Sequence, residues 1–269
     1  MTPQQLTLSY SQRVLAMLAM CALLMASGTL TRQVHAESIP VVAAAASMRY
    51  AMDDIAATFE RRTGQRVRFT YGATRSLMHQ IENGAPYELF LAADEESVWR
   101  LADKKRTEGT PSVFARGRIA IVAPSGSPVS VDGELTGLTE ALAAGDVDHV
   151  AIANPEVAPY GRAAREVLQK AGIWEDLGSR LIIGENVGQA AQFVTTGAAQ
   201  AGIIAYSLVA SSKIASLVTV ALIPEDWHQP INHSMTLLNG AGETARALAA
   251  FLKSEQARAI LERNGLSVP

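Results

Sequence analysis

From residue 39 onward the sequence repeats one pattern: a short run of apolar and β-branched residues, followed at once by a stretch with apolar residues every three or four positions. The short runs are typical of buried strands, and the longer stretches are typical of amphipathic helices. Strands that alternate with helices favour parallel pairing, because the helix returns the chain to the same edge of the sheet. The pattern therefore predicts an α/β fold of mostly parallel sheets flanked by helices.

The same pattern gives an expected order of elements. We expect strands at residues 39–44, 67–71, 88–92, 118–123, 149–153, 181–184, 201–205, 217–222 and 235–238. We expect helices at residues 48–59, 77–81, 161–170, 187–196, 243–252 and 255–264. Gly64, Gly172 and Gly197 follow three of these helices, and glycine is the residue best suited to the left-handed turn that ends a helix.

The proline- and serine-rich residues 124–128 interrupt this pattern and predict a place where the chain crosses between two lobes. The last two helices are expected to return to the first lobe and cover it. The first lobe is then discontinuous, with residues 37–123 and 229–269, and residues 124–228 form the second lobe. A ligand cleft is expected between the lobes.

The first 36 residues have the composition of a secretory signal peptide. Arg13 supplies a positive charge, residues 14–24 are an apolar run, and residues 34–36 end in a small-residue cleavage site. We expect this segment to be removed and the protein to work in the periplasm; a retained membrane anchor is the alternative. Cys21 lies inside the segment, so the remaining chain contains no cysteine and must be stabilised by burial alone.

The charge balance limits the partners. Without the signal segment, whose charged residues are Arg13 and Arg32, 21 basic and 26 acidic side chains remain, for a net charge of −5. Nucleic acid is therefore excluded as a partner, because phosphate binding requires a basic face. If this protein binds an anion, it must do so with local dipoles and not with its overall field.

Four turns share a feature that suits such binding: a predicted strand ends in small, hydroxyl or glycine residues, and a helix begins at once. These turns are residues 45–47, 72–74, 159–161 and 186–188. Helix N-termini present unpaired backbone N–H groups and the positive end of the helix dipole, so each turn is a potential anion site. The hydroxyls of Ser47, Thr74 and Tyr160 could add donors for a tetrahedral oxyanion, which offers only acceptors. One such turn alone is more often simple packing.

At these residues the sequence resembles the periplasmic molybdate-binding proteins, the substrate-binding components of molybdate importers of the ATP-binding-cassette type. The resemblance spans nearly all of the chain after the signal segment. Its main blocks are residues 43–47 (AAAAS), 51–55 (AMDDI), 83–94 (NGAPYELFLAAD), 158–161 (APYG) and 184–190 (GENVGQA).

The resemblance implies a two-lobed periplasmic-binding-protein fold of type II, which captures molybdate or tungstate and delivers it to an importer. It implies that Ser47 and Thr74 bind the oxyanion from the first lobe, and that Tyr160 and Val187 donate from the second. It also implies a monomer whose protein partner is a membrane permease. No cofactor is implied, and the metal enters as the oxyanion without direct side-chain ligands.

Three positions depart from the family pattern. Tyr160 occurs where some members have alanine, so its amide is a firmer ligand than its hydroxyl. Members with that alanine often carry a ligand tyrosine at the position of Ala205, whereas Tyr206 here is displaced by one residue and should point away. Arg75 is unusual beside the cleft; it could contact the anion, but we favour an orientation toward solvent.

Two alternatives remain open from the sequence. The first is a receptor for another small anion, such as sulfate, phosphate or a carboxylate. The second is a secreted enzyme, but we expect no enzyme: the chain has no Gly-x-Ser-x-Gly turn, and the histidines show no metal-ligand spacing. We expect packing or surface roles for His79 and His149, and we place His228 and His233 in a loop at the lobe boundary without a ligand role.

Overall fold

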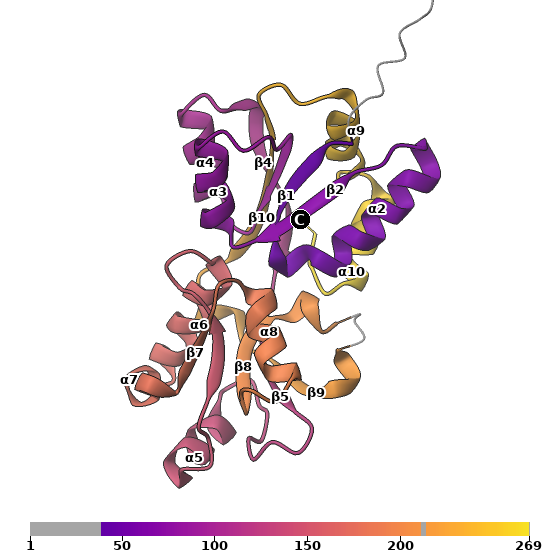
Figure 1. Ribbon diagram of the computed structural model, residues 1–269. Coiled ribbons are helices and arrows are strands. Elements are labelled where there is room, and N and C mark those ends of the chain that lie inside the picture. The colour runs from indigo at the N-terminus through magenta and orange to yellow at the C-terminus, as the bar shows by residue number, and fades with distance from the viewer. Residues whose placement is uncertain (1–38, 211–213, 269) are drawn as a thin grey trace, which may run out of the picture. The chain divides into compact units, whose positions relative to one another are not determined.

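The computed structural model describes residues 39–210 and 214–268. The predicted signal peptide, residues 1–36, lies outside the described residues. Within those residues, the chain forms two five-stranded sheets with flanking helices (Figure 1). No helix in this part of the chain combines the length and apolarity that crossing a membrane would require.

The first sheet has the strand order β2-β1-β3-β10-β4. Its strands are β1 (Val41–Ala45), β2 (Arg68–Gly72), β3 (Leu89–Ala92), β4 (Thr107–Gly117) and β10 (Ile231–Leu238). The first lobe consists of this sheet with helices η1 (Ala46–Met48), α2 (Arg49–Thr63), α3 (Thr74–Glu82), α4 (Glu96–Asp103), α9 (Glu243–Phe251) and α10 (Glu255–Arg263). The last two helices lie against this lobe: α9 packs on β10 and β3, and α10 packs on α2.

Side chains alternate between the two faces of the first sheet, as the period of a strand requires. Ala43 and Phe90 pack with apolar residues of α3 and α4 on one face, while Val42 and Leu91 pack with α2 on the other. Figure 1 shows α3 and α4 on one side of β1 and β2, and α2 and α10 on the opposite side. Both faces are covered, which explains why the central strands read as continuous apolar runs.

The second sheet has the strand order β7-β6-β8-β5-β9. Its strands are β5 (Ile119–Pro124), β6 (Val150–Ala153), β7 (Leu181–Gly184), β8 (Ala201–Ala205) and β9 (Val218–Leu222). The second lobe adds helices α5 (Thr136–Ala144), α6 (Pro159–Lys170), α7 (Trp174–Leu177) and α8 (Val187–Thr195), and short 3-10 turns η2 (Gly178–Arg180), η3 (Tyr206–Leu208), η4 (Ala215–Leu217) and η5 (Glu225–Trp227). The bounds of β7 and β8 are those predicted.

Both sheets are mostly parallel, as expected, but each contains one strand that runs in the opposite direction. In the first sheet β2, β1 and β3 pair in parallel, whereas β10 pairs antiparallel with β3 and β4. In the second, β7, β6 and β8 pair in parallel, and β5 is antiparallel to β8 and β9. The reason lies in the topology. Strands β5 and β10 each follow a crossing from the other lobe, so they start at the side of the sheet where the parallel strands end, and they must run in the opposite direction.

The crossing between the lobes lies earlier than predicted. The expected boundary at residue 123 was wrong for β5, because Ile119–Pro124 pairs with β8 and β9 of the second sheet. The chain crosses at Arg118, between the end of β4 and the start of β5, and returns through residues 223–230 between β9 and β10. The two crossings contact each other: Arg118 Nε lies 3.0 Å from Glu225 Oε1, and the Ile223 amide donates to the Ile119 carbonyl at 3.1 Å.

Strand β4 and helix α5 were not predicted. Strand β4 forms an edge of its sheet and contains Glu108, Gly109 and Pro111, which strands usually avoid. Proline has no amide hydrogen, and an edge strand tolerates it because one side of that strand has no neighbour to which the amide would donate. Helix α5 is apolar through most of its length, so its sequence lacks the polar face that marks an amphipathic helix.

Candidate anion-binding site

The four predicted turns follow strands that lie side by side. Ala45 and Gly72, the last residues of β1 and β2, are partners in the parallel pairing of the first sheet. Ala153 and Gly184, the last residues of β6 and β7, are partners in the second. Neighbouring parallel strands end at the same side of a sheet, so the two turns of each lobe lie close together as a direct result of strand pairing.

One small pocket joins these turns across the lobes. Its twelve lining residues are Ala45, Ala46, Ser47, Gly72, Ala73, Thr74, Ala93, Ala158, Pro159, Tyr160, Asn186 and Val187. All four predicted ligand residues are among them, and none of the twelve carries a charge. The four turns thus line one common pocket, and the binding roles of these residues remain predictions.

In the second lobe, neighbouring residues determine which backbone amides at the starts of α6 and α8 remain available to a ligand. Asn186 caps α8, and its Oδ1 accepts from the amides of Gly188 at 2.9 Å and Gln189 at 3.2 Å. The Val187 amide, at the first position of the helix, has no partner within the helix. At the start of α6, Pro159 has no N–H group, so the Tyr160 amide is the first donor of that helix.

In the first lobe, Ser47 and Thr74 are both almost completely buried. The Thr74 hydroxyl accepts from the Ala93 amide at 3.1 Å, so its own hydrogen is free to donate elsewhere. The next amide along α3, that of Arg75, donates to the Val157 carbonyl of the second lobe at 3.0 Å. This bond holds the start of α3 against the second lobe.

Sequence reasoning missed three residues directly behind the pocket. Ser207 donates its hydroxyl hydrogen to the Ser47 carbonyl at 2.7 Å. His233 lies fully buried on β10, so its expected place in a loop was wrong; its Nε2 lies 3.2 Å from the Tyr160 hydroxyl and 3.5 Å from the Ser47 hydroxyl. Gly117 leaves room for that tyrosine, since a Cβ there would lie 1.9 Å from the Tyr160 hydroxyl.

Burial governs the protonation of these groups. It lowers the pKa of His233 from 6.5 to about 3, so the imidazole is neutral at physiological pH. It raises the pKa of the Tyr160 phenol well above its usual value, while hydrogen bonds with Ser47 and Ser207 oppose this rise more weakly. Tyr160 therefore remains a protonated hydroxyl.

Arg75 and Tyr206 do not line the pocket. The Arg75 guanidinium lies 2.9 Å from Glu96 and 3.4 Å from the Glu156 carbonyl of the second lobe, and about a third of its side chain is exposed. It thus lies at the rim between the lobes, partly in solvent. Tyr206 packs beside Gly265, away from the pocket, as its displaced position predicted.

The free volume of the pocket is about 10 Å³, close to the minimum that holds one water molecule. A tetrahedral oxyanion requires more space. The lobes must therefore separate, or the lining residues must shift, for such a ligand to enter.

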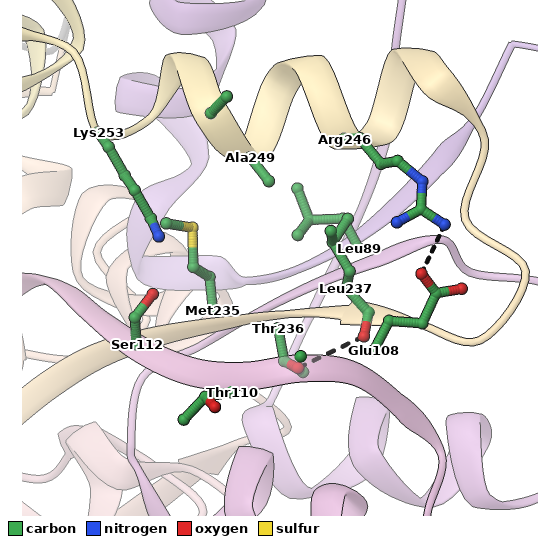
Figure 2. Close-up of a pocket in the computed structure, with 12 residues that line it drawn as sticks. Leu89, Glu108, Thr110, Ser112, Met235, Thr236, Leu237, Arg246, Ala249 and Lys253 are labelled. Atoms are coloured by element: carbon green, nitrogen blue, oxygen red, sulfur yellow. Dashed lines mark hydrogen bonds and ion pairs between the residues drawn. The ribbon is translucent and has the colours of Figure 1, made fainter.

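A larger hollow of about 340 Å³ lies between α9, β4 and β10 of the first lobe (Figure 2). Its floor is apolar, with Leu89, Met235 and Leu237. Arg246 at its rim is already paired with Glu108, as Figure 2 shows. No helix begins in this hollow, so it lacks the convergent amides of the smaller pocket. Among the described residues no cluster of three or more histidine, cysteine, aspartate or glutamate side chains could hold a metal ion.

Comparisons with known proteins agree with this geometry. The family model for bacterial extracellular solute-binding proteins matches residues 40–267. The molybdate-binding protein ModA of Rhodobacter capsulatus is 34% identical over 228 residues, covering 84% of this chain and 86% of that protein. The protein of the same name from Escherichia coli (strain K12) is 33% identical over 229 residues, covering 84% and 88%.

The solved structure of the Azotobacter vinelandii periplasmic molybdate-binding protein has a TM-score of 0.76 to this chain at 27% identity, and covers 86% of this chain and 99% of that one. Family model, relatives and fold all agree with the resemblance found in the sequence blocks. The chain therefore belongs to the bacterial extracellular solute-binding proteins, in the family of the molybdate-binding proteins.

Proposed function

We propose that this protein binds molybdate in the pocket between its lobes and delivers it to an importer of the ATP-binding-cassette type. The observation that carries the proposal is the convergence of Ser47, Thr74, Tyr160 and Val187 on one buried, uncharged pocket. The names of the relatives add the identity of the ligand.

The pocket suits a fully deprotonated tetrahedral dianion. Such a ligand has only acceptors, and the pocket offers the amides of helix starts together with hydroxyl groups. Donors fixed by the fold need little reorganisation on binding, and each hydrogen bond to a charged group is worth about 1.5–3 kcal/mol. Neutral donors can therefore hold a dianion although the protein itself is acidic.

Selectivity follows from size. A pocket of fixed radius leaves some donors out of reach of a smaller oxyanion such as sulfate, and a buried donor without a partner costs about 1–3 kcal/mol. We therefore expect molybdate, and tungstate of similar size, to bind more tightly than sulfate or phosphate.

The contacts between the lobes support a cycle of opening and closing. The Arg75 amide and the Ser207 hydroxyl each bond to a carbonyl of the opposite lobe, and an anion in the pocket would add further bridges. Closure is then favoured by donors that the open state leaves in water. We propose that the closed form, as a monomer in the periplasm after signal removal, is recognised by the membrane permease, and that no reaction is catalysed.

Isothermal titration of the chain without residues 1–36 tests this function. Molybdate and tungstate should each give tight, saturable binding with one site per chain, and sulfate, phosphate and acetate should give little or no heat at the same concentrations. Preferential binding of sulfate would assign the protein to another oxyanion, and the absence of binding to every anion would refute the proposal.

A further inference from the structure

One histidine connects the hydroxyl groups of both lobes behind the pocket. His233 comes from β10 of the first lobe and is 0% exposed. Its Nε2 is within reach of Tyr160 from the second lobe, at 3.2 Å, and of Ser47 from the first, at 3.5 Å. Ser207 of the second lobe also belongs to this cluster, because its hydroxyl donates to the Ser47 carbonyl at 2.7 Å.

The two ring nitrogens of His233 have different surroundings. Nδ1 is buried and has no hydrogen-bond partner among the described residues, whereas Nε2 faces two hydroxyl oxygens. A buried N–H group without an acceptor is rarer and less favourable than a buried acceptor without a donor. The hydrogen of the neutral ring is therefore best placed on Nε2, where it can be donated to Tyr160.

The direction of this bond matters for an anion. A hydroxyl group both donates and accepts, and it can point its hydrogen either into the pocket or away from it. An N–H donor behind the hydroxyl occupies its acceptor side, so the hydroxyl hydrogen must point elsewhere. The Nε2 hydrogen of His233 can be shared between the Tyr160 oxygen at 3.2 Å and the Ser47 oxygen at 3.5 Å, which leaves the hydrogens of both hydroxyls to point toward the pocket.

Resting on the molybdate-binding function proposed above, we propose that His233 is a positioning residue of the site: its Nε2 hydrogen is shared between the Tyr160 and Ser47 oxygens and thereby turns both hydroxyls into donors for the bound oxyanion. It does not contact the anion. Because the ring is neutral, it orders these donors without adding a charge that would attract smaller anions.

The experiment compares molybdate binding by the wild type, His233→Gln and His233→Met. Glutamine can place an N–H near the position of Nε2, whereas methionine fills the space without a donor. We expect His233→Met to weaken binding about tenfold to a hundredfold, the effect of losing one ordered hydrogen bond to a charged group, and His233→Gln to remain within about threefold. His149→Met, at an exposed histidine of the second lobe outside both crossings and outside the pocket lining, is the control and should bind as the wild type.

A cycle with Ser47→Ala tests whether the effect passes through the hydroxyls. In the Ser47→Ala background, His233→Met should cost clearly less than in the wild type, because one of the donors that it orders is gone. Equal costs in the two backgrounds would overturn the proposal. So would wild-type affinity of His233→Met, or equal losses in His233→Met and His233→Gln.

The tautomer gives a second readout that does not depend on a variant folding. Long-range proton–nitrogen correlation spectra of the wild type, with nitrogen-15 in histidine, should show His233 protonated at Nε2; protonation at Nδ1 would overturn the proposal even if His233→Met fails to fold. Failure of the wild type to bind molybdate would refute the proposed function instead, and the tautomer result would stand apart from it.

Discussion

Gly117 offers the sharpest test of how the pocket is built. It lies at the end of β4, and its φ is outside the left-handed region, so alanine meets no backbone penalty there. Replacing glycine by alanine at such a position normally stabilises a protein by about 0.4–1 kcal/mol, because the unfolded chain loses freedom. At Gly117 we expect alanine to destabilise the protein instead, because its Cβ would collide with the Tyr160 side chain.

The added Cβ would lie 1.9 Å from the Tyr160 hydroxyl oxygen, 2.9 Å from its Cζ and 3.4 Å from His233 Nε2. The tyrosine ring must move by about 1 Å or more to reach an ordinary contact distance, and this movement breaks its bond to His233. Overpacking of this kind costs about 1–3 kcal/mol. We therefore expect Gly117→Ala to lower the free energy of unfolding by that amount and to weaken molybdate binding about tenfold or more.

Urea denaturation and isothermal titration measure the two effects, and Tyr160→Phe provides the matched background. That substitution removes the 1.9 Å contact and leaves the 2.9 Å contact, so Gly117→Ala should be less destabilising in it by about 1 kcal/mol. If Gly117→Ala stabilises the protein, or costs the same in both backgrounds, the proposed packing of Tyr160 against Gly117 is incorrect.

Three further predictions concern the pocket and its surroundings. Ser47→Ala and Thr74→Ala should each weaken molybdate binding by about 1–3 kcal/mol in titration calorimetry, the cost of removing a donor to a charged group; wild-type affinity in both would mean that the site lies elsewhere. The pKa of His233 is about 3 in the folded state and 6.5 in the unfolded chain, so between these pH values the unfolded chain binds one more proton than the folded protein. The contribution of His233 to the free energy of unfolding should therefore be complete above pH 6.5 and should fall toward pH 3 by up to about 1.4 kcal/mol per pH unit. Urea denaturation should give a shallower dependence on pH for His233→Gln, and identical slopes would contradict burial of a neutral ring. Arg75→Ala should change molybdate affinity by less than about 1 kcal/mol and leave the preference over sulfate unchanged, because its ion pair with Glu96 is partly exposed; a large gain in sulfate binding would show that Arg75 reaches the ligand.

The parts of the site that sequence reasoning found depend on local rules. Ser47 and Thr74 were found because a strand that ends in small residues and leads into a helix can be recognised within a few positions. The pairing of Ala45 with Gly72 then follows from the geometry of parallel strands. Such features require no knowledge of distant contacts.

The parts that were missed depend on distant contacts. His233 is 186 positions from Ser47 in the sequence, and Ser207 is 160 positions from the carbonyl that it contacts. Nothing in the immediate sequence of either residue marks such a partner. The same limit explains the error over β5, since its apolar run fits a central strand of either sheet, and only pairing with β8 and β9 decides between them.

The two crossings between the lobes have a consequence for motion. The first crossing consists of a single residue, Arg118, between β4 and β5. The second, between β9 and β10, contains Pro224 and Pro230, whose rings fix the backbone angle φ. Since Arg118 and Glu225 form an ion pair, the two connections lie side by side and leave one line about which the lobes can turn. We therefore expect the proposed opening to be a rotation about this line, so that each closure returns the same donors to the pocket.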